Sequence, residues 1–153
     1  MYPRRAVRSS WLGVALLTAS TALVSLGLAA TAGCGGAPTR LVTVKVGTGE
    51  GAIQLEVKNL TDVPINNLYL AKSEQVGPQL DPDSPQGQAV WGPDLLSGAI
   101  ASGTRVPIPV AGPGRWDARA LDRDRRYQHV AALKLEAGGR YILELNEGGW
   151  RVQ

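Results

Sequence analysis

Apolar and polar residues alternate through most of the chain after residue 40. In AIQLEVKN (52–59), Ile53, Leu55 and Val57 fall on one side of an extended chain, and polar residues fall on the other. This period of two is typical of strands that bury one face. We therefore expect strands over 41–46, 52–59, 65–72, 104–110, 115–122, 127–135 and 140–146, with a candidate last strand at 150–152.

Turn residues divide these strands at short intervals. The pattern predicts an all-β fold, a single small antiparallel β-sandwich of the Ig-like or C2-like kind with about seven or eight strands. The GTGEG sequence after the first strand indicates a β-hairpin to the second, and Pro107 and Pro109 favour an edge position for 104–110. We expect a long loop over 73–90, and then a helical turn at 95–97 capped by Asp94.

The N-terminal part has a different pattern. Residues 11–32 contain no charged side chain, which is about the length that crosses a bilayer as a helix. Arg4, Arg5 and Arg8 precede this run, and small residues end it. A permanent membrane anchor and a secretory signal are the two alternatives, and the small residues before Cys34 favour the signal.

The stretch Thr31-Ala32-Gly33-Cys34 resembles the lipobox of bacterial lipoproteins, with Thr31 where leucine is commonest. The resemblance implies cleavage between Gly33 and Cys34, a diacylglyceryl group on the Cys34 thiol and an acyl chain on the new amine. It divides the chain into a signal peptide (1–33), a lipidated cysteine with a flexible tether (34–40) and a β-sandwich domain (41–153). Gly35, in place of aspartate, implies the outer membrane of the bacterial cell envelope.

Charge and cysteine content narrow the function further. Without the three N-terminal arginines, 13 Lys and Arg remain against 13 Asp and Glu, so the rest of the chain is neutral. A neutral domain lacks the cation surplus that binds nucleic acid. The single cysteine leaves no internal disulfide and no Cys/His metal set, so we expect no cofactor beyond the lipid on Cys34. The single histidine, His129, is interpreted as a half-exposed strand residue.

The segments WGPDLLSG (91–98) and RWDARALD (115–122) resemble a family of small secreted bacterial β-sandwich proteins of unknown function. The family pattern has Asn and Thr in an early turn, here Asn59 and Thr61, then a Trp-x-x-Asp-x-Leu motif and a strand ending in Asp. The matching candidate residues are Trp91, Asp94, Leu96, Gly103, Asp117, Arg119 and Asp122. The resemblance implies the fold and no reaction.

Two interpretations of these candidate residues remain open. In one they pack the domain, with Trp91 and Leu96 closing an end of the sandwich and Asp117 pairing with Arg119 on one strand face. In the other, Trp91, Asp94 and Asp117 form a ligand site. Asp122 is expected to form a turn at a charged hairpin tip in LDRDRR (121–126).

We therefore expect a lipid-anchored envelope lipoprotein, a non-catalytic binding or structural module in the periplasm or at the cell surface. Its partners would be the membrane, through the lipid, and an envelope protein or glycan. The alternative is a periplasmic enzyme or enzyme inhibitor that uses the carboxylates of Asp94, Asp117 and Asp122.

Overall fold

The computed structural model describes residues 36–77 and 80–152. The chain divides into two units, Met1–Ala32 and Gly33–Gln153, and all described residues belong to the second. The predicted signal peptide, the predicted cleavage site at Gly33 and the predicted acylation site Cys34 lie outside the described residues. Among the described residues, no helix combines the length and the apolar character that a membrane crossing requires.

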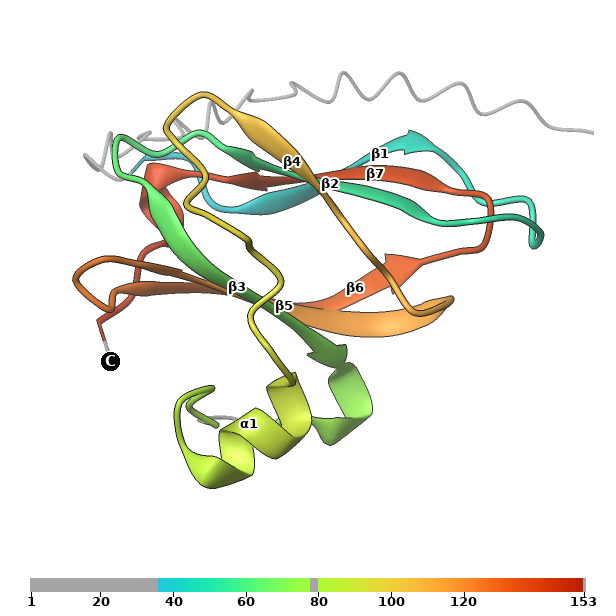
Figure 1. Cartoon of the computed structure of the whole chain (residues 1–153). Coiled ribbons are helices and arrows are strands. Elements are labelled where there is room, and N and C mark those ends of the chain that lie inside the picture. The colour runs from blue at the N-terminus through green and yellow to red at the C-terminus, as the bar shows by residue number, and fades with distance from the viewer. Residues whose placement is uncertain (1–35, 78–79, 153) are drawn as a thin grey trace, which may run out of the picture. The chain divides into compact units, whose positions relative to one another are not determined.

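The domain is built around strands in two stacked sheets (Figure 1). One sheet has the order β1-β7-β2-β4 and the other the order β3-β5-β6. The strands are β1 (Arg40–Lys45), β2 (Gln54–Asn59), β3 (Ile65–Lys72), β4 (Arg105–Ile108), β5 (Gly114–Asp122), β6 (Tyr127–Leu135) and β7 (Arg140–Leu145). The predicted all-β sandwich is confirmed, and each strand end lies within two residues of its predicted place. At the predicted last strand, Arg151 forms only an isolated bridge to Tyr127.

The predicted hairpin between the first two strands is wrong. β7 lies between β1 and β2, antiparallel to β1 and parallel to β2. The sheets are therefore not antiparallel throughout. The first two strands still run in opposite directions, as in a hairpin, but residues 46–53 must span about two strand spacings instead of one, roughly 10 Å. β4 pairs with β2 alone and is the edge strand that its prolines favour.

Apolar side chains from both sheets meet in one main core. In β5, every second residue contributes to this core, with Trp116, Ala118 and Ala120 between 1 and 6 % exposed. The small alanines allow the larger side chains of the facing sheet to approach. The other buried members are Leu55, Val57, Ile65, Leu68, Ile100, Ile108, Leu133, Leu135, Tyr141, Leu143 and Leu145.

Residues 73–77 and 80–91, together called segment 73–91, cover the outer side of the β3-β5-β6 sheet. This segment contains a 3-10 turn (Ser73–Gln75) and the helix α1 (Pro85–Trp91), so it is not the uninterrupted loop that we predicted. The Ser84 hydroxyl caps α1 by accepting from the Gly87 N–H at 2.9 Å, and Pro85 occupies the first turn. Figure 1 shows α1 on the side of this sheet that faces away from the other sheet.

Residues 36–39 lie against the turn that follows β7, and we name them the N-terminal strap. The N–H of Gly148 donates to the carbonyl of Ala37 at 3.1 Å, and the Asn146 side-chain amide donates to the carbonyl of Pro38 at 3.1 Å. The Thr39 hydroxyl donates to the side chain of Gln128, which is 1 % exposed. The hydrogen bonds of the domain therefore begin within the segment that we predicted as a tether.

Candidate functional site

Alternation along β5 creates a second buried layer on the outer face of the β3-β5-β6 sheet. Asp117, Arg119 and Leu121 point away from the main core because their neighbours point into it. Segment 73–91 covers them, and Trp91 reaches the face from the end of α1. The apolar part of this layer consists of Tyr69, Ala71, Trp91 and Leu121.

Asp117 is the polar centre of this layer. Its carboxylate accepts from the N–H of Ala132 at 2.9 Å and contacts Nε2 of His129 at 2.9 Å, while the residue is only 5 % exposed. Burial by itself raises the pKa of Asp117, but the Ala132 N–H, the hydroxyl of Ser73 and the His129 ring together hold it below the ordinary value. Asp117 is therefore ionised at neutral pH.

The backbone opposite Asp117 has an unusual conformation. Ala132 has a φ of 56°, in the left-handed region that residues with a side chain rarely adopt. The β5–β6 register also shifts between Trp116 and Ala118, so that Ala131 and Ala132 of β6 form a bulge opposite Asp117. The bulge turns the Ala132 N–H toward the carboxylate, and the charged hydrogen bond compensates for the backbone strain.

Trp91 and Arg119 share one hydrogen-bond acceptor. The indole N–H of Trp91 and the guanidinium of Arg119 both donate to the carbonyl of Leu80, at 2.9 and 2.8 Å. The Trp91 ring also meets the His129 ring edge to face, with 5.8 Å between centroids. Arg119 lies 4.2 Å from the Tyr127 ring, and burial lowers its pKa. These contacts pin segment 73–91 to the sheet.

The structure thus brings three predicted residues, Trp91, Asp117 and Arg119, onto one face, but not in the predicted pairs. Asp117 binds His129 and Ala132 rather than Arg119. Trp91 does not close an end of the sandwich with Leu96, because Trp91 packs in the outer layer and Leu96 packs against the main core. No sequence signal predicted the Asp117–His129 contact, which lies diagonally across the β5–β6 ladder.

Asp94 has a structural position at the start of β3. Its carboxylate accepts from the N–H of Leu68 at 2.9 Å, from the Asn67 side chain at 2.8 Å and from the N–H of Leu96 at 3.1 Å. The predicted helical turn at 95–97 is wrong, because those residues form no helix and α1 ends before Asp94. Asp94 instead ties the chain after α1 to β3.

Asp122 forms the predicted turn at the β5–β6 hairpin tip. Its carboxylate accepts from the N–H of Arg126 at 2.8 Å and from its guanidinium at 2.7 Å. Asn59 and Thr61 form a comparable buried turn: the Asn59 amide donates to the carbonyls of Val63 and Ile100, at 2.8 and 3.0 Å. These motif residues therefore fix turns.

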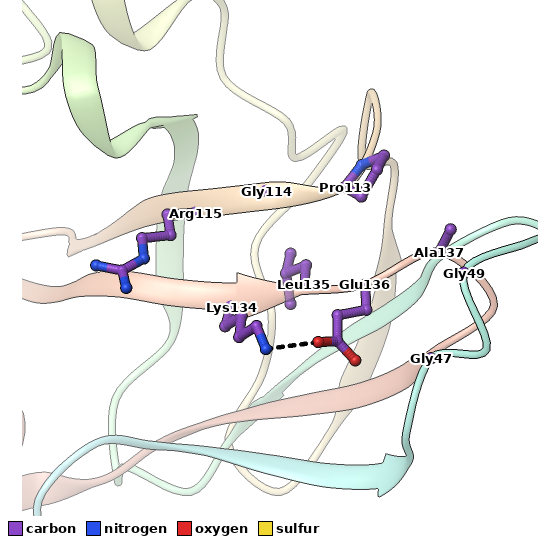
Figure 2. A pocket seen from close by; sticks show the side chains of 9 residues that line it. All are labelled: Gly47, Gly49, Pro113, Gly114, Arg115, Lys134, Leu135, Glu136 and Ala137. Carbon is purple, nitrogen blue, oxygen red and sulfur yellow. Dashed lines mark ion pairs between the residues drawn. The ribbon is translucent and has the colours of Figure 1, made fainter.

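A cavity between three turns lies at the end of the sandwich opposite the N-terminal strap. It has a volume of about 480 Å³, within the size range of ligand sites, and we name it the far-end cavity. Figure 2 shows it between the turns before β5, after β6 and after β1. Its lining residues are Gly47, Gly49, Pro113, Gly114, Arg115, Lys134, Leu135, Glu136 and Ala137.

Backbone hydrogen bonds hold two of these turns together. The N–H groups of Thr48 and Gly49 both donate to the carbonyl of Ala137, at 3.0 and 3.2 Å. Gly138 has a φ of 73°, and a Cβ there would lie 2.2 Å from the carbonyl oxygen of Glu50. Only glycine allows this approach, so the cavity wall is built from directly packed backbone.

Charged side chains lie at the rim of the far-end cavity. Lys134 and Glu136 form an ion pair at 2.6 Å, and this contact raises the pKa of Lys134. Arg115 lies directly opposite Lys134 in the β5–β6 register, where two like charges repel each other. Figure 2 shows the Arg115 guanidinium directed away from the ion pair. The rim therefore combines one paired cation with one directed to solvent.

A smaller cavity of about 330 Å³ lies beside the outer layer. Its acidic residues already have partners, since Asp94 binds β3 and Asp83 pairs with Arg125. The lining residues are Tyr69, Pro82, Asp83, Gln88, Gly92, Pro93 and Asp94. Burial, followed by the negative charges of Asp83 and Asp94, raises the pKa of Tyr69.

The chemistry of the outer layer is that of a structural network. Among the described residues, no hydroxyl or thiol hydrogen-bonds to His129, which an activated nucleophile would require. Within residues 36–77 and 80–152, no group of three His, Cys, Asp or Glu residues is arranged to hold a metal ion. No protein-family model, curated protein or solved structure matches this chain.

Proposed function

We propose that this protein is a lipid-anchored lipoprotein of the bacterial cell envelope, a non-catalytic module that binds an envelope component. The observation that carries the proposal is Thr31-Ala32-Gly33-Cys34 at the end of an uncharged run that follows three arginines. Acylation is the role that best explains a single cysteine at this position. Two or three acyl chains give stable anchoring, at about 0.8 kcal/mol for each buried methylene.

The far-end cavity supports a binding role for the folded part. It is larger than the cavity beside the outer layer, and apolar groups such as Leu135, Pro113 and Ala137 line it together with a few charges. This composition is typical of sites that hold a ligand by apolar contact and orient it by charge. We propose that the site takes a segment of an envelope protein or a glycan.

An enzyme or inhibitor that uses the predicted carboxylates is not favoured. Asp94, Asp117 and Asp122 lie at three different places, and each accepts hydrogen bonds from backbone or from a neighbouring side chain. Acid–base catalysis by paired carboxylates needs two such groups facing one substrate. The three residues are better explained as supports for the bulge and turns that they bind.

The anchor is tested by the intact mass of the protein purified from membranes. The expected mass corresponds to a chain that begins at Cys34 and carries diacylglyceryl and acyl groups. A Cys34→Ser variant is the matched control. It should carry no lipid and should partition into the aqueous phase instead of the detergent phase. An unmodified Cys34 thiol in the native protein would overturn the anchor.

The binding site is tested by blocking the cavity. Ala137→Trp places a large ring among the lining residues, and Ala131→Trp places the same ring on an exposed part of β6 outside the cavity. Both full-length variants would be used to capture components of detergent-solubilised envelopes, with mass spectrometry of proteins and glycans as the readout. Wild type and Ala131→Trp should retain the same component and Ala137→Trp should lose it. Equal retention by all three contradicts the cavity as the site.

A further inference from the structure

The two ends of the sandwich differ in where the chain enters. Arg40 of β1 pairs with Glu144, and Asn59 of β2 pairs with Leu145, so the end of β7 and the N-terminal strap lie at the same end. We name this the strap end. Gln54 of β2 pairs with Arg140, at the opposite end, beside the turns that line the far-end cavity. Figure 1 shows the 46–53 loop and the β5–β6 hairpin tip at opposite ends.

The connection between the acylation site and the fold is short. The strap is fixed to the domain from Gly36 onward, since a Cβ on Gly36 would lie 2.7 Å from that of Glu147 and the next residue is hydrogen-bonded to Gly148. Only Gly35 separates Gly36 from Cys34. Two residue steps span at most about 7 Å. An acylated Cys34 therefore holds the strap end at the depth of the lipid headgroups.

The surface around the strap has a composition that suits this place. Leu60 and Val152, 38 % and 83 % exposed, are two of the four large apolar side chains that the described residues leave in solvent, and the other two, Val44 and Val46, lie toward the far end. Leu60 is hydrogen-bonded through its N–H to Leu145, next to the turn that holds the strap, and Arg151 donates to the carbonyl of Gly148. Apolar side chains beside an arginine are favourable at a headgroup boundary.

We propose that the strap end rests on the phospholipid surface that holds the Cys34 acyl chains, with Leu60 in contact with lipid and the far-end cavity open to the aqueous side. The six residues of β7 separate the two ends by about 20 Å. The short connection, rather than a flexible tether, fixes this orientation. The inference rests on the proposed acylation and goes beyond it, because a long tether would leave the domain free to turn.

The test uses full-length acylated protein in phospholipid vesicles with a nitroxide spin label at one introduced cysteine. Leu60→Cys and Val46→Cys are a matched pair, because both replace an exposed apolar residue, Val46 being 67 % exposed at the far end. Acylation blocks the native thiol, and unsubstituted protein shows the background labelling. We expect the label at position 60 to be relaxed by oxygen, which concentrates in lipid, and the label at position 46 by an aqueous nickel chelate.

A spacer tests the cause of the orientation. Ten Gly and Ser residues between Gly35 and Gly36 add a coil of about 17 Å. We expect the label at position 60 to lose its lipid contact while Cys34 stays acylated. If that label remains in lipid with the spacer present, the short connection does not hold this end and the proposal is overturned.

The other outcomes separate this inference from the proposed function. If the intact mass shows acylation but both labels report water, or only position 46 reports lipid, the orientation is overturned and the anchor stands. If the mass shows an unmodified Cys34, the proposed function fails and the orientation fails with it.

Discussion

Replacing Gly148 by alanine should detach the N-terminal strap without a change in backbone preference. A Cβ on Gly148 would lie 1.9 Å from the carbonyl oxygen of Gly36 and 2.8 Å from that of Ala37. Both atoms belong to backbone, so no side chain can rotate away, and the strap must shift by about 1.5 Å to reach an ordinary contact distance of about 3.5 Å. The Gly148–Ala37 hydrogen bond, 3.1 Å long, cannot survive such a shift.

The energetic cost follows from the contacts that hold the strap. Loss of the Gly148–Ala37 and Asn146–Pro38 hydrogen bonds costs about 0.5–1.5 kcal/mol each. Alanine also reduces the conformational entropy of the unfolded chain, which stabilises the folded state by about 0.4–1 kcal/mol. We expect a net loss of about 1–2 kcal/mol in the free energy of unfolding.

The assay combines urea unfolding with amide exchange at Gly148 and Asn146, whose N–H groups face the strap. Gly112→Ala is the matched control, because a Cβ there meets nothing within 4 Å. Gly148→Ala should lower the urea midpoint and speed exchange at both amides, and Gly112→Ala should change neither by much. If Gly148→Ala exchanges like the wild type and is as stable as Gly112→Ala, the strap does not lie where the structure places it.

Three further predictions concern the buried polar groups and the cover of the sheet. Asn59→Ala should cost about 2–4 kcal/mol in urea unfolding because it removes two hydrogen bonds to buried carbonyls and leaves the buried N–H of Thr61 without its acceptor, whereas Asn66→Ala, at an exposed site, should stay within about 0.5 kcal/mol. The pKa of Asp117 is lower in the folded protein than in the unfolded chain, so ionised Asp117 stabilises the fold above about pH 4, and this stabilisation is lost as the pH falls through the folded pKa. In urea unfolding, the difference in free energy of unfolding between wild type and Asp117→Asn should therefore become smaller below about pH 4. Trp91→Ala should cost about 3–5 kcal/mol and expose segment 73–91 to limited proteolysis, and unchanged proteolysis would contradict its role in holding that cover.

The strands could be predicted because their signal is local. Alternation in each segment decides which side chains face the core, and Pro107 decides that β4 lies at an edge. The position of β7 between β1 and β2 is not local. Its register with both neighbours comes from side chains about a hundred residues away in sequence, and a glycine-rich turn looks the same whether its strands touch or stand one strand apart.

Helix α1 could have been predicted from two adjacent residues. Ser84 followed by Pro85 is a common helix start, because the serine hydroxyl caps a free N–H and proline needs no hydrogen bond in the first turn. The aspartates and prolines nearby favoured a loop instead. The misplaced helical turn after Trp91 follows from the same choice, since α1 ends at Trp91 and leaves Asp94 to bind β3.

The Asp117–His129 pair was beyond sequence reasoning for a geometric reason. In the β5–β6 register, His129 lies opposite Arg119, not Asp117. The contact forms diagonally, where the bulge and the left-handed Ala132 bring the strands out of regular register. Alternation along the two strands does not specify their register, and alanine gives no sequence signal for a positive φ.

The proposed binding and the proposed orientation depend on opposite ends of the same strands, and this separation lets them fail independently. The far-end cavity is bounded by turns that connect strand ends near Arg140, whereas the strap is held by residues that follow Leu145. At about 20 Å, beyond the range over which substitutions usually couple, a change at one end should leave the other intact. A domain that is both fixed to a membrane and open to a ligand needs this arrangement, because an attachment beside the cavity would press its opening against the lipid.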